Sequence, residues 1–502
     1  MSLLQFFWEV WHGKEPPVRV NPSRNDDLYL DSATRGTLVI GDPASGKTRY
    51  VAMQIFNRWK KSPHAMFVFD SSGGLTQCIL ELIAKDKESD KLLDKVVLDE
   101  IGNSEIVIPK PEFHPDYGLT DEEQVARVVQ NQLNLAEVMK EAAGFLTDTA
   151  IGETGKNLFR LLQAIRNEYR ENRWQITEAL DLLVDENKLR RACKKFGQYA
   201  PPAKKYFENQ YLIKEVPYRE RELSTRPLRK VLGMIDTDIA RATLGYYKPG
   251  WTPKEAEEKD LLVLIDAAAS ANLPQAKQYL ITQPFSQVMK WVNKRRPDDP
   301  NKKFIGIYFD ETVDILQIPG FARQLGMISP YYRSRKITLT IIIQALWQLD
   351  EKLAEQVWNM ANVVSFVVGN VKDSKIIAEQ LFDYDPKFIK NPAKTATQNN
   401  TTEPEGGQNR MTADWLQNIP SRSFVMRRYL TEQKKEKGVQ FIEQTDDFPP
   451  HPRGMTDDDM NDLIDGIRKA KMKERGVFIQ DALDVAQERS KFLDEDKSDP
   501  EF

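Results

Sequence analysis

The sequence predicts an α/β protein with a mainly parallel central sheet, because short apolar segments alternate with helical ones and one long stretch lacks strands. Strands are expected at residues 28–30, 37–40, 65–69, 95–99, 261–265, 304–309, 337–343, 363–368 and 423–428. Helices at 47–61 and 274–294 lie between them, and such connecting helices cover the faces of a parallel sheet. Residues 28–118 and 246–450 are therefore expected to form the two parts of one core.

Residues 119–245 interrupt that core and predict an all-α insertion domain. Helical patterns recur there at 124–143, 153–169, 176–183, 188–196 and 203–209. Within the second part of the core, residues 393–408 have no periodicity and predict a loop. Residues 1–27 are expected to form an N-terminal aromatic helix and linker, and residues 451–502 a charged acidic tail.

The aromatic N-terminal segment leaves two interpretations open. Its apolar residues are Leu3, Leu4, Phe6, Phe7, Trp8, Val10 and Trp11. In a helix they would cover more than half of the circumference, so the helix either packs on its own domain or binds a membrane surface or a membrane-bound partner. The sequence has no run of about 18 apolar residues, which predicts a cytoplasmic protein, peripheral to the membrane at most through a partner.

The net charge and the cysteine content argue against two features: attraction of nucleic acid by the molecule as a whole, and a zinc site. The formal net charge of the chain is -4, so binding to nucleic acid would need a local basic patch. The two cysteines, Cys78 and Cys193, are far apart and do not have metal-ligand spacing, so a zinc site is not expected.

The segment from Gly41 to Thr48 matches the pattern G-x-x-x-x-G-K-[ST] and lies between an apolar strand and a helix. In this context, successive backbone N–H groups converge on phosphate oxygens, and the helix presents its positive end to the same anion. Lys47 is expected to reach the β- and γ-phosphates of ATP, and the Thr48 hydroxyl to ligate Mg²⁺. The predicted nucleotide-binding residues are Gly41, Asp42, Pro43, Ala44, Ser45, Gly46, Lys47, Thr48 and Arg49.

The strand at 304–309 ends in two carboxylates, Asp310 and Glu311. Ligands gather at the carboxyl ends of the strands of a parallel sheet. We expect Asp310 to hold Mg²⁺ and Glu311 to orient the water that attacks the γ-phosphate. The alternative is an ordinary strand with acidic residues at its exposed end.

The strand at 337–343 carries a further pair of candidates. Gln344, directly after it, is expected to hydrogen-bond the γ-phosphate or its water, and Arg333, before it, to reach the nucleotide of an adjacent subunit. Arg335, two residues away, is the alternative candidate for that arginine. The alternatives are a helix-capping residue for Gln344 and a surface charge for Arg333.

Together these motifs resemble the HerA/FtsK class of P-loop motors, and within it the TraG/TraD-like coupling proteins of type IV secretion and conjugation. The resemblance runs from Thr37 to Leu430 and includes two further segments, Phe67 to Gly74 and Phe113 to Pro115. Ala44 stands where the family has a glycine, and His114 where it has an asparagine.

The resemblance implies a RecA-like P-loop NTPase core, ATP and Mg²⁺ as cofactors, and ATP-driven translocation of DNA by a ring, usually a homo-hexamer. The implied partners are single-stranded DNA or a DNA–protein complex, and a secretion-channel or membrane-anchor protein. The family's usual N-terminal transmembrane anchor is not recognisable, which keeps open a soluble motor for DNA packaging or processing. A nucleotide-gated protein adaptor is a further alternative.

Two regions are candidates for contact with partners. The acidic tail would recruit a basic protein cargo or only solubilise the chain. The insertion holds a mixture of basic and aromatic residues that would track phosphates and stack on bases, or form a solvated helical face. These residues are Arg190, Arg191, Lys194, Lys195, Tyr199, Lys204, Lys205, Tyr206, Arg219, Arg221, Arg226, Arg229 and Lys230.

Overall fold

The computed structural model describes residues 36–138, 150–168, 174–273, 276–296, 303–311, 334–349, 357, 362–381, 413–428, 439–445, 447–452 and 454–491. The segment 1–27, the strand at 28–30, the loop at 393–408 and Arg333 lie outside these residues. The chain forms two compact units. Unit 1 contains residues 1–94, 300–313 and 326–464, and unit 2 contains residues 95–299, 314–325 and 465–502.

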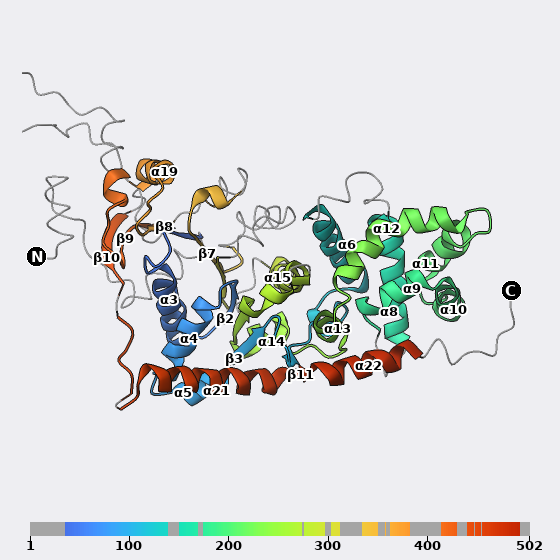
Figure 1. Cartoon of the computed structure of the whole chain (residues 1–502), viewed down its shortest axis with the longest axis horizontal. Coiled ribbons are helices and arrows are strands. Elements are labelled where there is room, and N and C mark those ends of the chain that lie inside the picture. Colours follow the sequence, from blue (N-terminus) through green and yellow to red (C-terminus); the bar gives the residue numbers. More distant parts are fainter. Residues whose placement is uncertain are drawn as a thin grey trace, which may run out of the picture. The chain divides into compact units, whose positions relative to one another are not determined.

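Unit 1 is built around a mainly parallel sheet (Figure 1). The pairs β8–β1, β1–β7, β7–β6 and β6–β2 are parallel, whereas β10–β9 and β9–β8 are antiparallel. The expectation of an α/β fold with a mainly parallel sheet is therefore confirmed. In spatial order the strands are β10 (Val439–Gln444), β9 (Ser423–Arg428), β8 (Asn362–Ser365), β1 (Thr37–Ile40), β7 (Ile337–Ile343), β6 (Ile305–Asp310) and β2 (Ala65–Asp70).

The central strands are buried along their whole length. Near-continuous apolar runs such as Ile337–Ile343 are typical of strands in parallel sheets with both faces covered. The helices of unit 1 are α3 (Lys47–Lys61), α4 (Gly74–Ala84), α5 (Ser89–Leu93), α19 (Val371–Leu381) and the first part of α21 (Asp457–Arg475).

The register of the sheet brings the carboxyl ends of four strands to one edge. Ile40 at the end of β1 pairs with Ile343 of β7, Ile342 of β7 pairs with Asp310 of β6, and Asp310 pairs with Asp70 of β2. The segments that follow these strands are therefore neighbours in space, although they are far apart in sequence.

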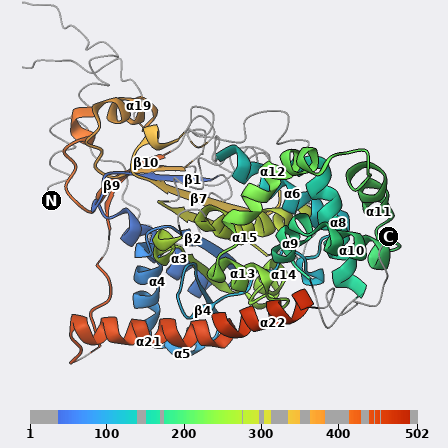
Figure 2. The same cartoon turned by 45° about the vertical axis from the view of Figure 1, so that its right-hand side comes forward.

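Unit 2 contains two pairs of strands and most of the described helices. β3 (Val96–Glu100) pairs in parallel with β5 (Leu262–Asp266), and β4 (Ile106–Val107) pairs antiparallel with β11 (Val477–Phe478). Figure 2 shows α8 to α12 gathered into one helical group. The helices are α6 (Asp121–Val138), α8 (Lys156–Glu168), α9 (Ala179–Val184), α10 (Glu186–Phe196), α11 (Pro201–Tyr206), α12 (Tyr218–Met234), α13 (Asp238–Gly245), α14 (Pro253–Lys259), α15 (Ala276–Lys294) and α22 (Ile479–Lys491).

The sequence does not predict α12 and α13. Pro227 lies inside α12, and an interior proline removes a backbone donor and usually breaks a helix. Here the apolar face of α12 is nevertheless buried at Leu228, Val231 and Leu232. Tertiary packing therefore outweighs the local preference against a helix.

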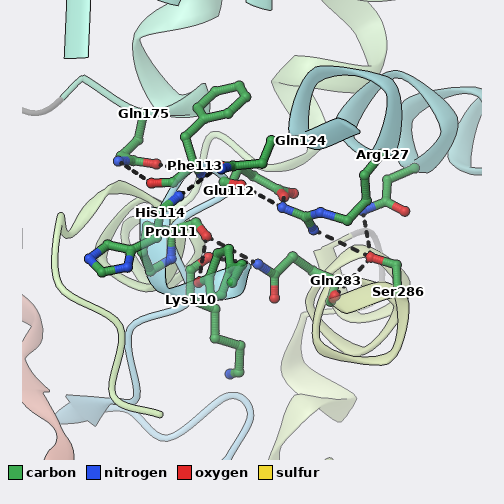
Figure 3. Close-up of polar contacts among 12 residues, drawn as sticks. Lys110, Pro111, Glu112, Phe113, His114, Gln124, Arg127, Gln175, Gln283 and Ser286 are labelled. Carbon is green, nitrogen blue, oxygen red and sulfur yellow. Dashed lines mark hydrogen bonds and ion pairs between the residues drawn. The ribbon is translucent and has the colours of Figure 1, made fainter. Parts of the chain in front are cut away.

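A buried polar network joins the segment 110–114 to the helices beside it (Figure 3). Arg127 of α6 forms an ion pair of 2.8 Å with Glu112, and both side chains are almost completely buried. Gln283 of α15 donates a hydrogen bond of 3.0 Å to the carbonyl oxygen of Lys110. Because this segment has no strand partner for these backbone groups, side chains from α6 and α15 satisfy them instead.

His114 caps a short helical turn with its side chain. Its Nδ1 accepts a hydrogen bond of 3.2 Å from the backbone N–H of Asp116, at the start of the short helical turn Pro115–Tyr117. An asparagine oxygen caps helical turns in the same way. The ring nitrogen of His114 therefore caps this turn.

The segment expected to be a charged acidic tail contains regular structure from Asp457 to Lys491, and residues 465–491 belong to unit 2. Arg468 of α21 pairs with Glu100 at 2.6 Å and with Asp266 at 2.9 Å. Farther along, α22 packs against α13, and β11 pairs with β4. Within the described residues, no helix has the length and apolar character to cross a membrane.

Candidate functional site

The P-loop, residues 41–48, connects β1 to α3 and is held from several sides in unit 1. The N–H of Asp42 donates a hydrogen bond of 2.8 Å to the carbonyl oxygen of Val367, and the Asp42 carboxylate accepts one of 2.8 Å from the N–H of Gly369. A side chain at Gly41 would meet Cβ of Phe366 at 2.6 Å, so only glycine fits there. These contacts fix the loop before any ligand binds.

Ala44 and Gly46 both have left-handed backbone conformations, with φ of 58° and 107°. Glycine adopts such angles without cost, whereas a residue with Cβ does so at a cost of about 1 kcal/mol or more. The loop therefore keeps its curved path at Ala44 although that residue is not a glycine.

Lys47 folds over this loop. Its Nζ donates hydrogen bonds to the carbonyl oxygens of Gly41, at 2.5 Å, and Asp42, at 2.7 Å. Burial lowers the pKa of Lys47 below its usual value, although the nearby carboxylates of Asp310, Glu311 and Asp42 act in the opposite direction. The ammonium group is thus held at the loop and faces a cluster of negative charge.

Asp310 is the most deeply buried acid of this cluster, with a relative exposure of 1%. Burial raises its pKa to about 8, and the carboxylates of Asp70 and Glu311 contribute to the rise, while Lys47 and the Thr48 hydroxyl lower it. Although Thr48 is near, neither carboxylate oxygen of Asp310 accepts a hydrogen bond of regular geometry from the described residues. A buried acid without donors is suited to a cation.

Asp70 has a different role from Asp310, although the two residues are paired in register. Its carboxylate accepts hydrogen bonds from the N–H groups of Gly73, at 2.8 Å, and Thr76, at 2.7 Å. It also accepts from the backbone and hydroxyl of Ser72. Asp70 therefore organises the turn into α4, and it adds negative charge beside Asp310.

Glu311 follows β6 with a left-handed backbone, at φ 49°. Its carboxylate accepts a hydrogen bond of 2.6 Å from the side-chain amide of Gln344, which follows β7. Gln348 holds Gln344 in turn, because its side-chain oxygen accepts from the N–H of Gln344 at 3.0 Å. A strained conformation at a residue that is held by such contacts is typical of functional sites.

The structure therefore brings together Lys47, Thr48, Asp310, Glu311 and Gln344, all of them in unit 1. Three carboxylates, those of Asp310, Glu311 and Asp42, lie near one ammonium group, and Asp70 adds a further negative charge beside Asp310. This excess of negative charge, with the two unsatisfied oxygens of Asp310, fits a divalent cation such as Mg²⁺ with Thr48 and Asp310 as its holders. The backbone cradle of the P-loop fits an anion beside it.

The structure also places the second arginine candidate, and it contains two contacts near the P-loop that the sequence does not predict. Arg335 is half-buried in the turn before β7. Arg422, which precedes β9, lies against the P-loop: its backbone N–H donates a hydrogen bond of 2.8 Å to the carbonyl oxygen of Ser45. Its side chain pairs with Asp447, which follows β10. No local pattern marks these residues, because only the strand order of the sheet brings them to the loop.

No protein-family model matches the chain, and no curated protein sequence matches it. Solved structures are similar in fold. The unbound form of the bacterial conjugative coupling protein TrwBdeltaN70 aligns with a TM-score of 0.53 and 12% identity, over 83% of this chain and 88% of that one. TrwB with the ATP analogue ADPNP aligns with a TM-score of 0.50 and 12% identity, over 88% of this chain and 92% of that one.

TrwB in complex with ADP and Mg²⁺ gives the same TM-score of 0.50 and 12% identity, over 84% of this chain and 87% of that one. At this identity the similarity concerns the fold alone. It covers most of both chains, and it agrees with the mainly parallel sheet and its many helices. The chain thus has the α/β, RecA-like P-loop NTPase fold of the conjugative coupling protein TrwB, as its sequence motifs predict.

Proposed function

We propose that this protein is an ATPase of the type IV coupling protein kind, which uses ATP hydrolysis to move DNA. The observation that carries the ATPase is the convergence of the P-loop with Asp310, Glu311 and Gln344 at one edge of the sheet. Two kinds of group are needed for phosphoryl transfer to water, a cradle for the phosphates and a carboxylate for the water, and both are present.

Each residue then has a defined task. Lys47 and the backbone of the P-loop bind the phosphates of ATP, and Thr48 and Asp310 hold Mg²⁺, which neutralises charge on the phosphates. Glu311 orients and polarises the attacking water. The hydrogen bond of 2.6 Å from Gln344 fixes the carboxylate of Glu311, so Gln344 positions that group. Gln344 is also close enough to respond to the water or γ-phosphate at Glu311.

The ATPase is tested by steady-state hydrolysis of Mg-ATP and by ATP binding. Lys47→Ala should lose both, and Glu311→Gln should lower kcat by about 100-fold or more while still binding ATP. Lys61→Ala, an exposed lysine at the other end of α3, serves as the matched control and should keep wild-type activity. Hydrolysis at the wild-type rate by Glu311→Gln would remove Glu311 from the proposed role.

DNA as the substrate of the motor is supported by two observations. The fold is that of TrwB, which is described as a conjugative coupling protein. In unit 2, the helices α10 to α12 and the segment between them expose several basic residues to solvent, and exposed lysines and arginines provide the charge that phosphate contacts need. These residues include Arg190, Lys194, Lys205, Lys214, Arg219, Arg226 and Lys230.

A DNA motor hydrolyses ATP faster when DNA is bound. We therefore expect the ATPase rate at low salt to rise on addition of single-stranded DNA, with double-stranded DNA measured in parallel. A rate that neither form of DNA changes would contradict the translocase and leave the ATPase standing. The homo-hexamer, with Arg333 or Arg335 acting on a neighbour's nucleotide, is part of the same proposal.

A further inference from the structure

The turn that follows β7, residues 344–348, is held by side chains of two different segments. The backbone N–H groups of its first three residues all donate to side-chain oxygens. Gln348, within the turn, accepts from Gln344 at 3.0 Å and from Ala345 at 3.1 Å. The third N–H, that of Leu346, donates to a residue outside the turn. The path of this β7 turn therefore depends on another part of unit 1.

Asp373 of α19 is the acceptor of this third hydrogen bond, at 2.8 Å from the Leu346 nitrogen, and it is 2% exposed. It lies in the first turn of α19, and the positive end of a helix stabilises a buried carboxylate. Asn370 caps that turn by accepting from the N–H groups of Lys372, at 2.9 Å, and Asp373, at 3.2 Å. The position of the Asp373 carboxylate is therefore set by the start of the helix.

Strand register explains why α19 reaches the β7 turn. β8 and β7 are the neighbours of β1 on its two sides, and all three strands run parallel. Their last residues, Ser365, Ile40 and Ile343, lie in one row of the sheet. The segment after β8 therefore starts beside the P-loop, and the helix that it enters bonds the turn after β7 through Asp373.

Residues 366–373, here called the brace, also hold the P-loop. The Asp42 N–H donates to the carbonyl oxygen of Val367, and the Asp42 carboxylate accepts from the N–H of Gly369, both at 2.8 Å. A Cβ atom at Gly369 would lie 2.8 Å from that carboxylate, so the brace approaches the loop closely at a residue without a side chain. One short segment thus contacts the P-loop at one end and the β7 turn at the other.

We propose that Asp373 is a positioning residue for ATP hydrolysis: by fixing the β7 turn, it holds the Gln344 amide against the Glu311 carboxylate. The inference rests on the proposed ATPase, in which Glu311 orients the attacking water. Gln344 donates to Glu311 at 2.6 Å, so a shift of the turn would move or release that carboxylate. A misplacement of about 1 Å at a reacting group can lower a rate by roughly 100-fold.

The test measures kcat for ATP hydrolysis and, separately, the affinity for the β,γ-imido analogue of ATP with Mg²⁺. Asp373→Ala should lower kcat by roughly tenfold, as the loss of a supporting hydrogen bond behind a functional group does, and leave the affinity within about twofold. Asp373→Asn keeps an oxygen that can accept from the Leu346 N–H, so it should recover most of the rate.

Ser374→Ala is the matched control. Ser374 follows Asp373 in the same turn of α19 and is completely buried. Its hydroxyl bonds Gln417, at 2.9 Å, and the carbonyl oxygen of Val371, at 3.1 Å, rather than the β7 turn. This variant also loses a buried hydrogen bond of α19, but its kcat should stay within about twofold of the wild type.

A double-mutant cycle separates positioning from a general loss of stability. When Gln344→Ala is already present, Asp373→Ala should cause no further loss of kcat, because the amide that the turn positions is gone. Gln348→Ala, which removes the other acceptor of the β7 turn, should lower kcat and show the same dependence on Gln344. It carries the test if thermal unfolding shows that Asp373→Ala does not fold.

The outcomes separate this inference from the proposed function. If the wild type does not hydrolyse ATP, the proposed function fails, and the inference fails with it. If Gln344→Ala hydrolyses ATP at the wild-type rate, the inference is overturned while the ATPase stands. It is likewise overturned if Asp373→Ala or Gln348→Ala keeps the wild-type kcat, if Asp373→Asn is as slow as Asp373→Ala, if Ser374→Ala loses as much, or if the losses multiply in the double variant.

Discussion

Asp310 combines two properties that oppose stable folding. Its carboxyl group is buried, and it lies beside the carboxylates of Asp70 and Glu311 without a hydrogen-bond donor of regular geometry among the described residues. A buried acid in such surroundings is retained for function rather than for stability, because a hydrogen-bonded or apolar residue would fold more favourably. The free energy lost at Asp310 is recovered when a cation binds.

Asp310→Asn should therefore stabilise the metal-free protein and abolish ATP hydrolysis. The amide is neutral at all pH values, so it avoids the cost of a buried carboxylate. We expect the melting temperature of the metal-free variant to exceed that of the wild type by several degrees at pH 8. Thermal unfolding with a chelator present measures this difference.

The pH dependence gives this prediction its internal control. The pKa of Asp310 is raised from 3.8 to about 8 in the folded protein, so the folded state holds its proton longer than the unfolded state does. The free energy of unfolding therefore decreases as the pH rises from about 4 to about 8, because the unfolded chain releases this proton more readily than the folded protein does. The advantage of Asp310→Asn should shrink as the pH falls from 8 toward 4, because the carboxyl group becomes protonated in the folded protein over this range. An advantage that stays constant from pH 8 to pH 4 would exclude this cause.

At the scale of elements, strands and the P-loop helix follow from local sequence more closely than other parts do. β1 and β7 have the bounds expected from their apolar runs, since a buried parallel strand has to be apolar throughout. The helix α3 has the bounds expected from its place after the P-loop. α12 escapes prediction because of Pro227. The contact of Arg422 with the P-loop depends on the pairing of β9 with its neighbouring strands, which no local signal specifies.

The burial of the C-terminal helix α22 is likewise not predicted by its local sequence. Acidic runs at both ends of the segment 451–502 suggest a solvated tail, yet Arg489 of α22 is almost completely buried and pairs with the buried Glu178 at 2.9 Å. A small apolar cluster of Val107, Ala242 and Ala482 lies in the same region of unit 2. Burial of α22 therefore depends on a partner surface that is distant in sequence.

Arg489→Met should destabilise unit 2 by about 3 kcal/mol, because it leaves the charge of Glu178 buried without its cation. Arg241→Met is the matched control: Arg241 pairs with Asp236 in unit 2, but both side chains are about one-third exposed, so the loss should be below about 1 kcal/mol. Urea unfolding measures both effects. Equal midpoints for the two variants would show that the Arg489–Glu178 pair does not stabilise the folded state.

At the scale of the whole molecule, charge is distributed unevenly. The chain has 71 basic and 75 acidic residues, so the molecule as a whole does not attract DNA. Several arginines of the helical region have structural partners instead: Arg221 forms an ion pair of 2.8 Å with Glu186, and Arg229 donates to the carbonyl oxygen of Leu183. Contact with DNA would therefore depend on the basic residues that are exposed on α10, α11, α12 and the segment between α11 and α12.

Charge reversal separates DNA contact from ATP hydrolysis. A variant with glutamate at Lys205, Lys214, Arg219 and Arg226, all exposed, should lose stimulation by single-stranded DNA and keep its basal ATPase, since these residues belong to unit 2 and the catalytic residues to unit 1. Wild-type stimulation should also fall steeply with salt, because phosphate contacts release counterions.

The control variant has glutamate at four exposed lysines elsewhere in the chain, Lys91, Lys95, Lys372 and Lys375, which gives the same change in net charge. If stimulation of the ATPase by DNA depends only on the net charge of the protein, both variants lose it equally, because each shifts the charge of the chain by the same amount. If the helices of unit 2 contact DNA, only the first variant loses it. Stimulation that survives in both variants would place the DNA contact elsewhere in the chain, and a loss of basal ATPase in the first variant would show that the helical region is needed for hydrolysis itself.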